Sequence, residues 1–176
     1  MQINKALFLD RDGVINHNLG YVYKKDDFKF IDGIFELVKA AKIKKYLVIV
    51  VTNQAGIGRG FYNENDFFVL MEWVKIKFKH NDSSIDDIFF CPFHPTHGLG
   101  SYKKDSHLRK PNPGMIIEAQ KKHNLNLSKS IMIGDNISDM EASKSSGIGT
   151  SILFSEGKSF KDAFGIENLR QALDYL

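Results

Sequence analysis

The sequence predicts an α/β protein built in three layers, with a central parallel sheet covered by helices on both faces. Short apolar runs, mostly of β-branched or aromatic residues, alternate along the chain with longer amphipathic stretches. Each run is apolar at successive positions, which is typical of strands buried on both faces in parallel sheets. Strands that alternate with helices form such a sheet through right-handed crossover connections.

These patterns define where each element is expected. The strands are expected over 6–9, 47–51, 85–90, 131–133 and 151–154, and the helices over 34–43, 64–79, 113–123 and 137–146. Asn112 is expected to cap the third helix with Pro113 in its first turn, and Gly147 to end the fourth. Because ligands of open parallel sheets bind beyond the carboxyl ends of the strands, we expect the functional residues there.

The composition is that of an ordinary globular protein, with 176 residues of which 43% are hydrophobic and 26% charged. This length predicts a single domain over 1–176. The 24 basic and 21 acidic side chains leave a net charge of only +3, which argues against a nucleic-acid partner. One cysteine, Cys91, excludes an internal disulfide framework and is typical of a reducing compartment.

Nothing in the sequence indicates a membrane partner. No apolar run approaches the roughly 20 residues that span a bilayer. Residues 1–10 predict a buried strand rather than a secretory signal, because their apolar run is very short and ends in an aspartate. We therefore expect a cytoplasmic protein, and we expect it to be a monomer.

A pair of carboxylates follows the first predicted strand, in the sequence DRDG at 10–13. Asp10 and Asp12 at the end of a buried strand are costly for folding unless a cation lies between them. A hard divalent cation with oxygen ligands meets this need. By itself the motif is equally consistent with a solvated turn built on an aspartate and a glycine.

Complementary groups follow other predicted elements. TNQAG at 52–56 offers a hydroxyl, amides and small residues whose backbone N–H groups can approach a phosphate, and GDNISD at 134–139 adds two carboxylates after a glycine. RKPNP at 109–113 places a cationic pair before the third predicted helix. Each segment alone is also consistent with a polar turn, a capped helix or a surface basic pair. Their shared position at strand ends and helix starts predicts one site.

In order along the chain, FLDRDGVI at 8–15, VTNQ at 51–54, RKP at 109–111 and GDNISD at 134–139 resemble the four motifs of haloacid dehalogenase phosphatases. NLGY at 18–21, NQAGIGRG at 53–60 and RKPNPGM at 109–115 narrow the resemblance to the histidinol-phosphate and D-glycero-D-manno-heptose 1,7-bisphosphate phosphatase subfamily. The resemblance covers about residues 5–155. It implies a Rossmann-like fold, and no insertion between the motifs is long enough for a separate cap domain.

The resemblance also implies roles for the motif residues. Asp10 would attack phosphorus as the nucleophile, and Asp12 would protonate the leaving oxygen and then take a proton from water. Mg²⁺ would be held by Asp10, Asp135 and the main-chain carbonyl of Asp12. Thr52 and Lys110 would complete the catalytic set by binding the non-bridging phosphate oxygens.

The outer part of the implied site would choose the substrate. Asp139 would orient Lys110 or a metal-bound water, and Arg109 would bind a second phosphate or the sugar end. The flap within 11–32 and the segments around Asn53 and Arg109 must then select the substrate. The implied substrate-binding residues are Asn18, Gly20, Tyr21, Asn53, Gln54, Ala55, Arg109 and Asn136.

The sequence departs from this subfamily at its zinc loop, which is usually written Cys-x-His followed by Cys-x-Cys. Here the corresponding segments are CPFHP at 91–95 and SHL at 106–108, so three of the four usual ligands are replaced. Cys91, His94, His97 and His107 would be the members of a substitute site. Histidines in a polar loop are more often simply solvated, and we expect no structural zinc. The departure affects the expected order of residues 92–108 and not the catalytic residues.

The expected function is Mg²⁺-dependent hydrolysis of a sugar phosphate, with the C7 phosphate of a heptose 1,7-bisphosphate for surface glycan as the leading substrate. Histidinol phosphate is the nearest alternative within the same chemistry. A polynucleotide 3′-phosphatase would need a continuous basic groove, which the weakly basic composition does not provide. A catalytically silent binding module on the same fold would be expected to lack one of the motif aspartates.

Overall fold

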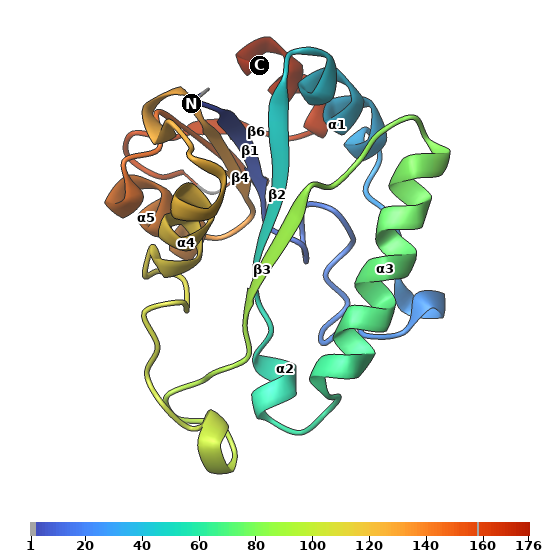
Figure 1. Cartoon of the computed structure of the whole chain (residues 1–176), viewed down its shortest axis with the longest axis vertical. Coiled ribbons are helices and arrows are strands. Elements are labelled where there is room, and N and C mark those ends of the chain that lie inside the picture. The colour runs from blue at the N-terminus through green and yellow to red at the C-terminus, as the bar shows by residue number, and fades with distance from the viewer. Residues whose placement is uncertain (1–2, 158) are drawn as a thin grey trace.

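The computed structural model describes residues 3–157 and 159–176, and within them the chain forms a six-stranded parallel sheet (Figure 1). The strand order is β3-β2-β1-β4-β5-β6, and every neighbouring pair is parallel. The strands are β1 (Lys5–Leu9), β2 (Tyr46–Asn53), β3 (Asp87–Cys91), β4 (Ile131–Gly134), β5 (Thr150–Phe154) and β6 (Phe164–Ile166). The predicted three-layer α/β architecture is confirmed.

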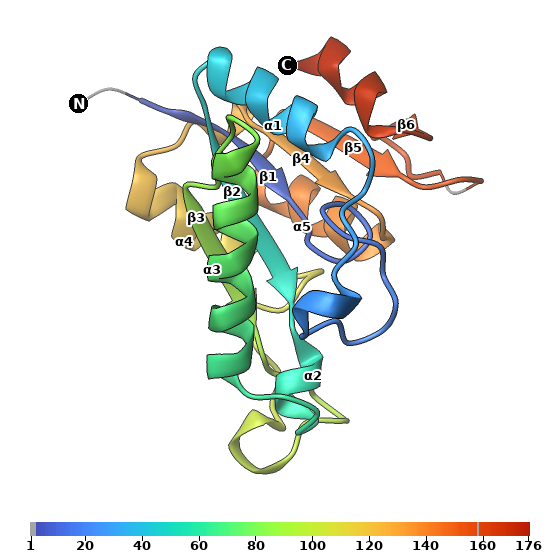
Figure 2. The ribbon, with the colours of Figure 1, turned by 90° about the vertical axis from the view of Figure 1, so that its right-hand side faces the viewer.

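Helices cover both faces of the sheet. The α-helices are α1 (Ile34–Ile43), α2 (Ala55–Gly58), α3 (Glu64–His80), α4 (Gly114–His123) and α5 (Ile137–Ser146). The 3-10 helices are η1 (Lys25–Asp27), η2 (Gly100–Tyr102), η3 (Leu127–Lys129) and η4 (Leu169–Tyr175). Helices α4 and α5 lie on one face, and α1, α3 and η4 lie on the other, as Figures 1 and 2 show. None of the helices in the described part of the chain has the length and apolar character that crossing a membrane requires.

The runs at 6–9, 47–51 and 131–133 within the central strands are apolar at successive positions because each face of the sheet has its own core. Leu7 and Leu9 of β1 pack with the α1 and α3 side, whereas Phe8 between them packs with the α4 and α5 side. All three side chains are fully buried. Successive side chains of a strand point to opposite faces, so two buried faces remove the polar alternation of a one-sided sheet.

β6 and α2, like the four 3-10 helices given above, were not predicted from the sequence. β6 is three residues long at the edge of the sheet, and Phe164 within it is 52% exposed, so it lacks a buried apolar run. α2 is a single turn of small residues that continues directly from the end of β2. Neither element is long enough to show a periodic pattern.

The predicted start of the third helix was wrong by one residue. Helix α4 begins at Gly114 with Pro113 as its N-cap, and the Asn112 side chain instead donates a hydrogen bond to the Ser106 carbonyl. Asn112 is therefore held by the preceding loop rather than by the helix. Gly147 does end α5, in the left-handed conformation at φ 83° that favours glycine.

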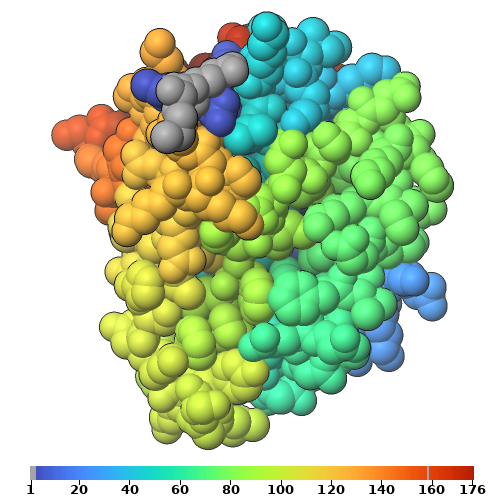
Figure 3. Space-filling model, viewed as in Figure 1, coloured from blue at the N-terminus to red at the C-terminus, as the bar shows by residue number. Residues whose placement is uncertain are grey.

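The parallel arrangement determines where the functional segments meet. The carboxyl ends of β2, β1 and β4 are neighbours at one edge of the sheet, so the residues after each strand lie side by side. Beyond this edge, the loop at 92–113 and α2 form the lower end of the molecule (Figures 1 and 3). No separate cap domain covers this edge in residues 3–157 and 159–176. The site is covered only by loops.

Candidate active site

A cavity of about 400 Å³ lies at the carboxyl edge of the sheet. It is lined by Asp10, Asp12, Asn18, Gly20, Tyr21, Thr52, Asn53, Gln54, Ala55, Gly56, Tyr62, Arg109, Lys110, Asp135, Asn136, Ser138 and Asp139. Every residue that the resemblance implied for catalysis, substrate binding or Mg²⁺ binding is in this set. The fold therefore brings segments from four separate parts of the chain around one space.

Lys110 is the buried centre of charge in this cavity. Its Nζ lies 2.9 Å from Asp10 Oδ1 and 2.6 Å from Asp139 Oδ1, and it donates a hydrogen bond of 2.9 Å to the Val51 carbonyl. Burial alone would lower the pKa of the Lys110 ammonium, but the carboxylates of Asp10 and Asp139 raise it above its ordinary value. Lys110 is therefore a fixed cation at neutral pH, placed beside the candidate nucleophile.

Asp10 lies in a surplus of negative charge. Burial raises the pKa of Asp10 to about 7, Lys110 opposes this rise, and the carboxylates of Asp139 and Asp135 add to it. Oxygens of Asp10, Asp135 and Asp139 all lie within 4.8 Å of one another. One ammonium cannot balance three carboxylates at this spacing, so the donor set suits a divalent cation with oxygen ligands.

Gly13 allows this cluster to close. Its backbone has φ +94°, and a β-carbon at this position would lie 2.2 Å from Asp135 Oδ2. Any larger residue would both strain the turn and push Asp135 away from Asp10. The glycine of the first motif is therefore required by the close approach of two loops.

Both carboxylate oxygens of Asp139 contact protein groups. Oδ1 is paired with Lys110, and Oδ2 accepts a hydrogen bond of 3.0 Å from the Asn136 backbone N–H in the capping box of α5. Both oxygens of Asp139 are therefore used by protein groups, one by the cation of Lys110 and one by the start of α5.

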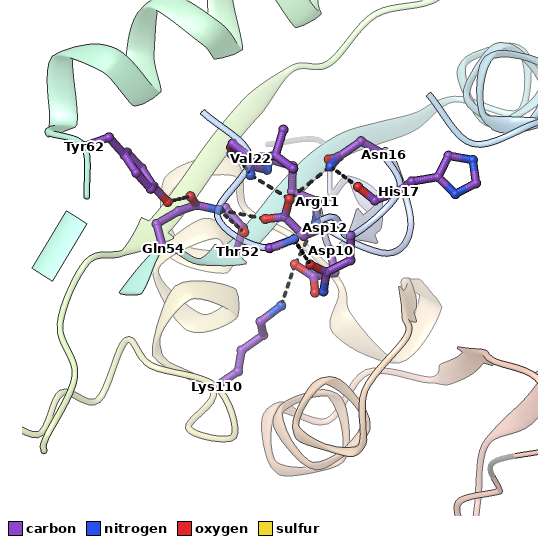
Figure 4. A network of polar contacts seen from close by, with 12 residues as sticks. Asp10, Arg11, Asp12, Asn16, His17, Val22, Thr52, Gln54, Tyr62 and Lys110 are labelled. Carbon is purple, nitrogen blue, oxygen red and sulfur yellow. Dashed lines mark hydrogen bonds and ion pairs between the residues drawn. The ribbon is translucent and has the colours of Figure 1, made fainter. Parts of the chain in front are cut away.

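The Asp12 carboxylate faces a different set of partners, shown in Figure 4. Oδ1 accepts hydrogen bonds from Arg11 Nη2 at 2.6 Å and from Asn16 Nδ2 at 3.0 Å. Oδ2 accepts a hydrogen bond from Gln54 Nε2 at 3.2 Å. With these side-chain donors around it, the carboxylate has a fixed orientation, and it is not one of the three clustered carboxylates that are spaced for a metal.

Gln54 connects Asp12 to the second strand. Its Nε2 also donates to Thr52 Oγ1 at 2.8 Å, and its Oε1 accepts a hydrogen bond from the Tyr62 hydroxyl. Burial raises the pKa of Tyr62 to about 12, so its phenol remains a hydrogen-bond donor at neutral pH. The side chain of Gln54 is thus used to hold the site together.

Asn53 joins the end of β2 to the segment that carries Lys110. Its Nδ2 donates to the Lys110 carbonyl, its Oδ1 accepts from the Lys110 backbone N–H, and both bonds measure 3.0 Å. The side chain lines the cavity, but its amide is paired with the Lys110 backbone. This reciprocal pair places the Lys110 side chain relative to the strand end.

The flap closes against α2 through aromatic contacts. Tyr21 follows Gly20 and packs on Phe61 with 4.7 Å between the ring centroids, and its hydroxyl accepts a hydrogen bond from Arg59. A β-carbon at Gly56 would lie 2.3 Å from the Tyr62 ring and 2.8 Å from the Tyr21 ring. Gly56 therefore permits the flap to approach α2 closely.

Residues 92–108 form a loop beside the cavity, here called the rim loop. The Leu99 backbone N–H donates to the Gly58 carbonyl at 2.7 Å, and the Tyr102 hydroxyl donates to Glu64 at 3.0 Å. The Lys104 ammonium lies 4.0 Å from the centroid of the Phe93 ring. Arg109 donates a hydrogen bond of 3.3 Å to the Phe93 carbonyl, so the rim loop contacts the guanidinium that lines the cavity.

The residues of the suggested substitute zinc site are divided among other contacts. His94 Nδ1 accepts from the backbone N–H groups of Thr96 and His97, and the exposed His107 lies 3.5 Å from Glu118. Cys91 is buried, with its Sγ 3.9 Å from the Phe93 carbonyl. In the described part of the chain, one group of three or more His, Cys, Asp or Glu side chains is spaced for a metal. It consists of Asp10, Asp135 and Asp139.

Sequence reasoning gave no role to Arg11, Asn16 or Tyr62, which connect the cavity to the core. Arg11 is fully buried, as is Asn16, and Tyr62 is 7% exposed. Arg11 lay inside the recognised first motif, but nothing in its neighbours showed that it would turn inward. Tyr62 lies eight positions beyond Gln54, so only the fold brings their side chains together.

Comparison with known proteins places this geometry among phosphatases. Residues 107–170 match a hydrolase-like family model described as "HAD-hyrolase-like". The D-glycero-alpha-D-manno-heptose-1,7-bisphosphate 7-phosphatase of Burkholderia mallei is 50% identical over 177 residues, covering 98% of this chain and 94% of the relative. A protein of the same name from Campylobacter jejuni is 44% identical and covers 97% of this chain and 95% of its own length. The D-glycero-beta-D-manno-heptose-1,7-bisphosphate 7-phosphatase of Vibrio cholerae is 45% identical, with 87% and 82% covered.

Solved structures share the fold. A putative HAD-like phosphatase from Mesorhizobium loti matches with a TM-score of 0.89 and 30% identity, covering 98% of this chain and 84% of its own. The D,D-heptose 1,7-bisphosphate phosphatase from B. bronchiseptica, in complex with magnesium and phosphate, matches with a TM-score of 0.83 at 23% identity and 97% coverage of both chains. The overall fold is therefore common to this chain and to these two solved structures.

Proposed function

The chain belongs to the haloacid dehalogenase-like phosphatases and is a phosphoric monoester hydrolase, and from this premise we propose that it removes the C7 phosphate of D-glycero-α-D-manno-heptose 1,7-bisphosphate with the help of Mg²⁺. The single observation that carries the proposal is the ion pair between the buried Lys110 and the half-buried Asp10, 2.9 Å apart, in a cavity that is also lined by Arg109. Asp10, Lys110 and Asp139 are here called the floor of this cavity. The pair is suited to a reacting phosphate, and Arg109 is available for a second one.

In the proposed reaction, an oxygen of Asp10 attacks phosphorus in line with the sugar oxygen. A phosphorus–oxygen bond forms at Asp10, and the bond to the C7 oxygen breaks. Asp12 gives its proton to that leaving oxygen. Asp12 then takes a proton from a water molecule, which attacks phosphorus and returns Asp10 as a free carboxylate with release of phosphate. Support comes from the three side-chain donors that hold the Asp12 carboxylate in one orientation.

The lysine and the threonine would act on the transferring group. The Lys110 ammonium is held at the cavity by Asp10, Asp139 and the Val51 carbonyl, so it is preorganised for non-bridging phosphate oxygens. Thr52 lines the same cavity beside it, at the carboxyl end of β2. The charge that develops on the phosphoryl oxygens would thus meet an ammonium and a hydroxyl held in place by the fold, with Lys110 giving up one of its three contacts to bind the phosphate.

Asp10, Asp135 and the main-chain carbonyl of Asp12 would hold Mg²⁺. The three carboxylates within 4.8 Å of one another and the raised pKa of Asp10 both indicate a missing positive charge that such an ion supplies. When bound, the ion neutralises the repulsion between the Asp10 carboxylate and the phosphate dianion. The B. bronchiseptica structure was obtained with magnesium and phosphate, which supports this choice of metal.

The choice of the α anomer follows the relatives rather than the site. The two relatives described above that cover 97% or more of this chain are both named for the α anomer, and the relative named for the β anomer covers 87%. Histidinol phosphate remains the chemical alternative. Its ammonium would be repelled by Arg109, whereas a second phosphate would be bound by the same guanidinium.

A phosphate-release assay over a panel of substrates tests this proposal. The panel contains the α and β anomers of the heptose 1,7-bisphosphate, heptose 7-phosphate, histidinol phosphate and a 3′-phosphorylated oligonucleotide, each with and without Mg²⁺. We expect the α-bisphosphate to have the highest kcat/KM and to lose only its C7 phosphate. A higher kcat/KM for histidinol phosphate or the oligonucleotide would contradict the substrate, and turnover without a divalent metal would contradict the mechanism.

A further inference from the structure

Arg11 is a fully buried arginine beside the reacting groups, and its guanidinium is held by one nitrogen. Nη2 donates to Asp12 Oδ1 at 2.6 Å and to the Val22 carbonyl at 2.6 Å. The aromatic rings of Phe28 and Phe67 lie 6.0 and 5.9 Å from its central carbon. Arg11 therefore contacts both the candidate general acid and the backbone of the flap.

Burial of the Arg11 guanidinium costs free energy, so its presence in the core calls for a reason other than stability. Arg11 Nε and Nη1 have no hydrogen-bond partner in the described part of the chain, although the whole side chain is removed from solvent. Removing a cation from water costs several kcal/mol, and apolar residues of similar volume often replace a buried ion pair without loss of stability. The stability of the fold alone therefore does not explain an arginine at this position.

The remaining contacts of Asp12 make the orientation of its carboxylate depend on Arg11. Arg11 and Asn16 share Oδ1, and Gln54 alone donates to Oδ2. The Arg11 bond is the shortest of the three and the only one from a charged donor, so it is the strongest constraint on the carboxylate. The Asp12 side chain is still 21% exposed on the cavity side of this network, so it remains accessible to a bound ester.

We propose that Arg11 is a positioning residue that holds the Asp12 carboxyl for proton transfer and joins it to the flap. The same nitrogen that contacts Asp12 donates to the Val22 carbonyl, and Asn18, Gly20 and Tyr21 just before Val22 line the cavity. A flap displaced from the substrate would therefore draw Arg11 away from Asp12. This inference rests on the proposed role of Asp12 as general acid.

Substrates with different leaving groups can distinguish a positioning role of Arg11 from a merely structural one. A sugar alkoxide leaves only with a proton from Asp12, whereas p-nitrophenolate is stable enough to leave without one. The parameter kcat/KM reports the steps up to departure of the leaving group, so it excludes the later role of Asp12 in water activation. A misplaced acid lowers kcat/KM for the sugar phosphate alone, and a damaged cavity lowers it for both esters.

The experiment compares Arg11→Met and Arg11→Lys with the wild type on the heptose bisphosphate and on p-nitrophenyl phosphate, both with Mg²⁺. Displacement of a catalytic group by about 1 Å costs on the order of 100-fold in rate. We expect Arg11→Met to lower kcat/KM for the sugar phosphate by about 10- to 100-fold and for p-nitrophenyl phosphate by less than about threefold. Arg11→Lys keeps a charge and one donor nitrogen, so we expect a smaller change in the same direction.

Two further variants make the result decisive. Arg170→Met removes an arginine that pairs with Asp32 and Glu36 on the surface, and it should leave both esters unchanged. Asp12→Asn should show the same selective loss as Arg11→Met, and more strongly. If Asp12→Asn lowers kcat/KM equally for both esters, Asp12 is not the general acid, and the proposed role of Arg11 is wrong as well.

Suppose that Asp12→Asn lowers kcat/KM for the sugar phosphate alone. If the folded Arg11 variants then lower kcat/KM equally for both esters, or for neither, only the positioning role of Arg11 is overturned. Circular dichroism and thermal unfolding identify a variant that does not fold. Should Arg11→Met not fold, Arg11→Lys decides the question, because an unchanged ratio of the two kcat/KM values in that variant contradicts the proposal.

Discussion

The floor of the cavity and the rim loop are held by opposite kinds of contact. On the floor, Lys110 is paired with Asp10 and Asp139 at 2.9 and 2.6 Å, with the lysine side chain only 3% exposed. The rim loop (92–108) consists mainly of exposed or half-buried residues and is attached through single hydrogen bonds, with an ammonium–ring contact between Lys104 and Phe93 inside the loop.

This difference assigns a different task to each region. Charges in a buried, low-dielectric site interact strongly and keep their geometry, which is what a phosphoryl transfer requires. Exposed hydrogen bonds and cation–ring contacts contribute little individually, about 0.5–1 kcal/mol for the latter. Substitutions in the rim loop, including those at the positions where the resemblance implies zinc ligands, are therefore expected to disturb the floor little.

Replacement of the nucleophile Asp10 is expected to cause the largest loss of activity. Asp10→Asn should abolish turnover of every ester, by at least about 10⁴-fold, because an amide cannot attack phosphorus. The fold should remain, since Lys110 keeps its contact with Asp139. Phosphate release and circular dichroism measure the two effects. Substantial turnover by a pure Asp10→Asn sample would exclude an aspartyl-phosphate intermediate.

Removal of divalent metal separates the two regions directly. Chelation with EDTA should remove activity, because the three clustered carboxylates need a divalent cation, and Mg²⁺ alone should restore it. The rim loop should keep its structure, because its described contacts are made by protein groups. Metal analysis and hydrogen exchange over 92–108 test this. Stoichiometric zinc whose removal unfolds the loop would instead establish the histidine-based site.

Loss of Arg109 should affect substrates unequally. A charge-assisted hydrogen bond contributes about 1.5–3 kcal/mol, which corresponds to about 10- to 150-fold in kcat/KM. We expect Arg109→Ala to lower kcat/KM by that factor for the heptose bisphosphate and to leave p-nitrophenyl phosphate nearly unchanged. Steady-state kinetics on both esters decide the matter. Equal damage to both would place Arg109 at the reacting phosphate.

The affinity for Mg²⁺ should depend on pH because of Asp10. Burial and the neighbouring carboxylates raise its pKa to about 7 without a metal, so below this pH the ion must displace a proton from its ligand. The dissociation constant should therefore increase by up to about tenfold for each pH unit below 7 and become constant above 8. Titration calorimetry from about pH 6 to about pH 8 measures this. A constant affinity over the range would show that Asp10 is already ionised without metal.

The smallest expected effect comes from loosening the rim loop. Lys104→Ala removes the ammonium over the Phe93 ring, and the Phe93 carbonyl accepts the hydrogen bond from Arg109. We expect KM for the heptose bisphosphate to increase by about two- to fivefold, in line with the small energy of one such contact, with kcat unchanged. Lys103→Ala, at the neighbouring exposed position, is the matched control. A lower kcat would show that the rim loop acts on the floor.

Much of the fold was predictable because its signals are local. The runs at 6–9 and 131–133 predicted buried strands, and both lie in the middle of the sheet. β6 was missed because an edge strand of three residues carries no such run. The start of α4 was misplaced because the side chain of Asn112, a good cap by type, is used by the Ser106 carbonyl instead.

The sequence by itself determined most of the groups that line the cavity, because motif residues follow directly from strands whose parallel order brings their ends together. Only the tertiary structure decided how each group is used. Asn53 is paired with the backbone of Lys110, 57 positions away, and Arg11 turns inward between Phe28 and Phe67 rather than toward solvent. The physical reason is that side-chain hydrogen bonds and burial depend on distances between segments that are remote in the sequence, and local patterns carry no information about those distances.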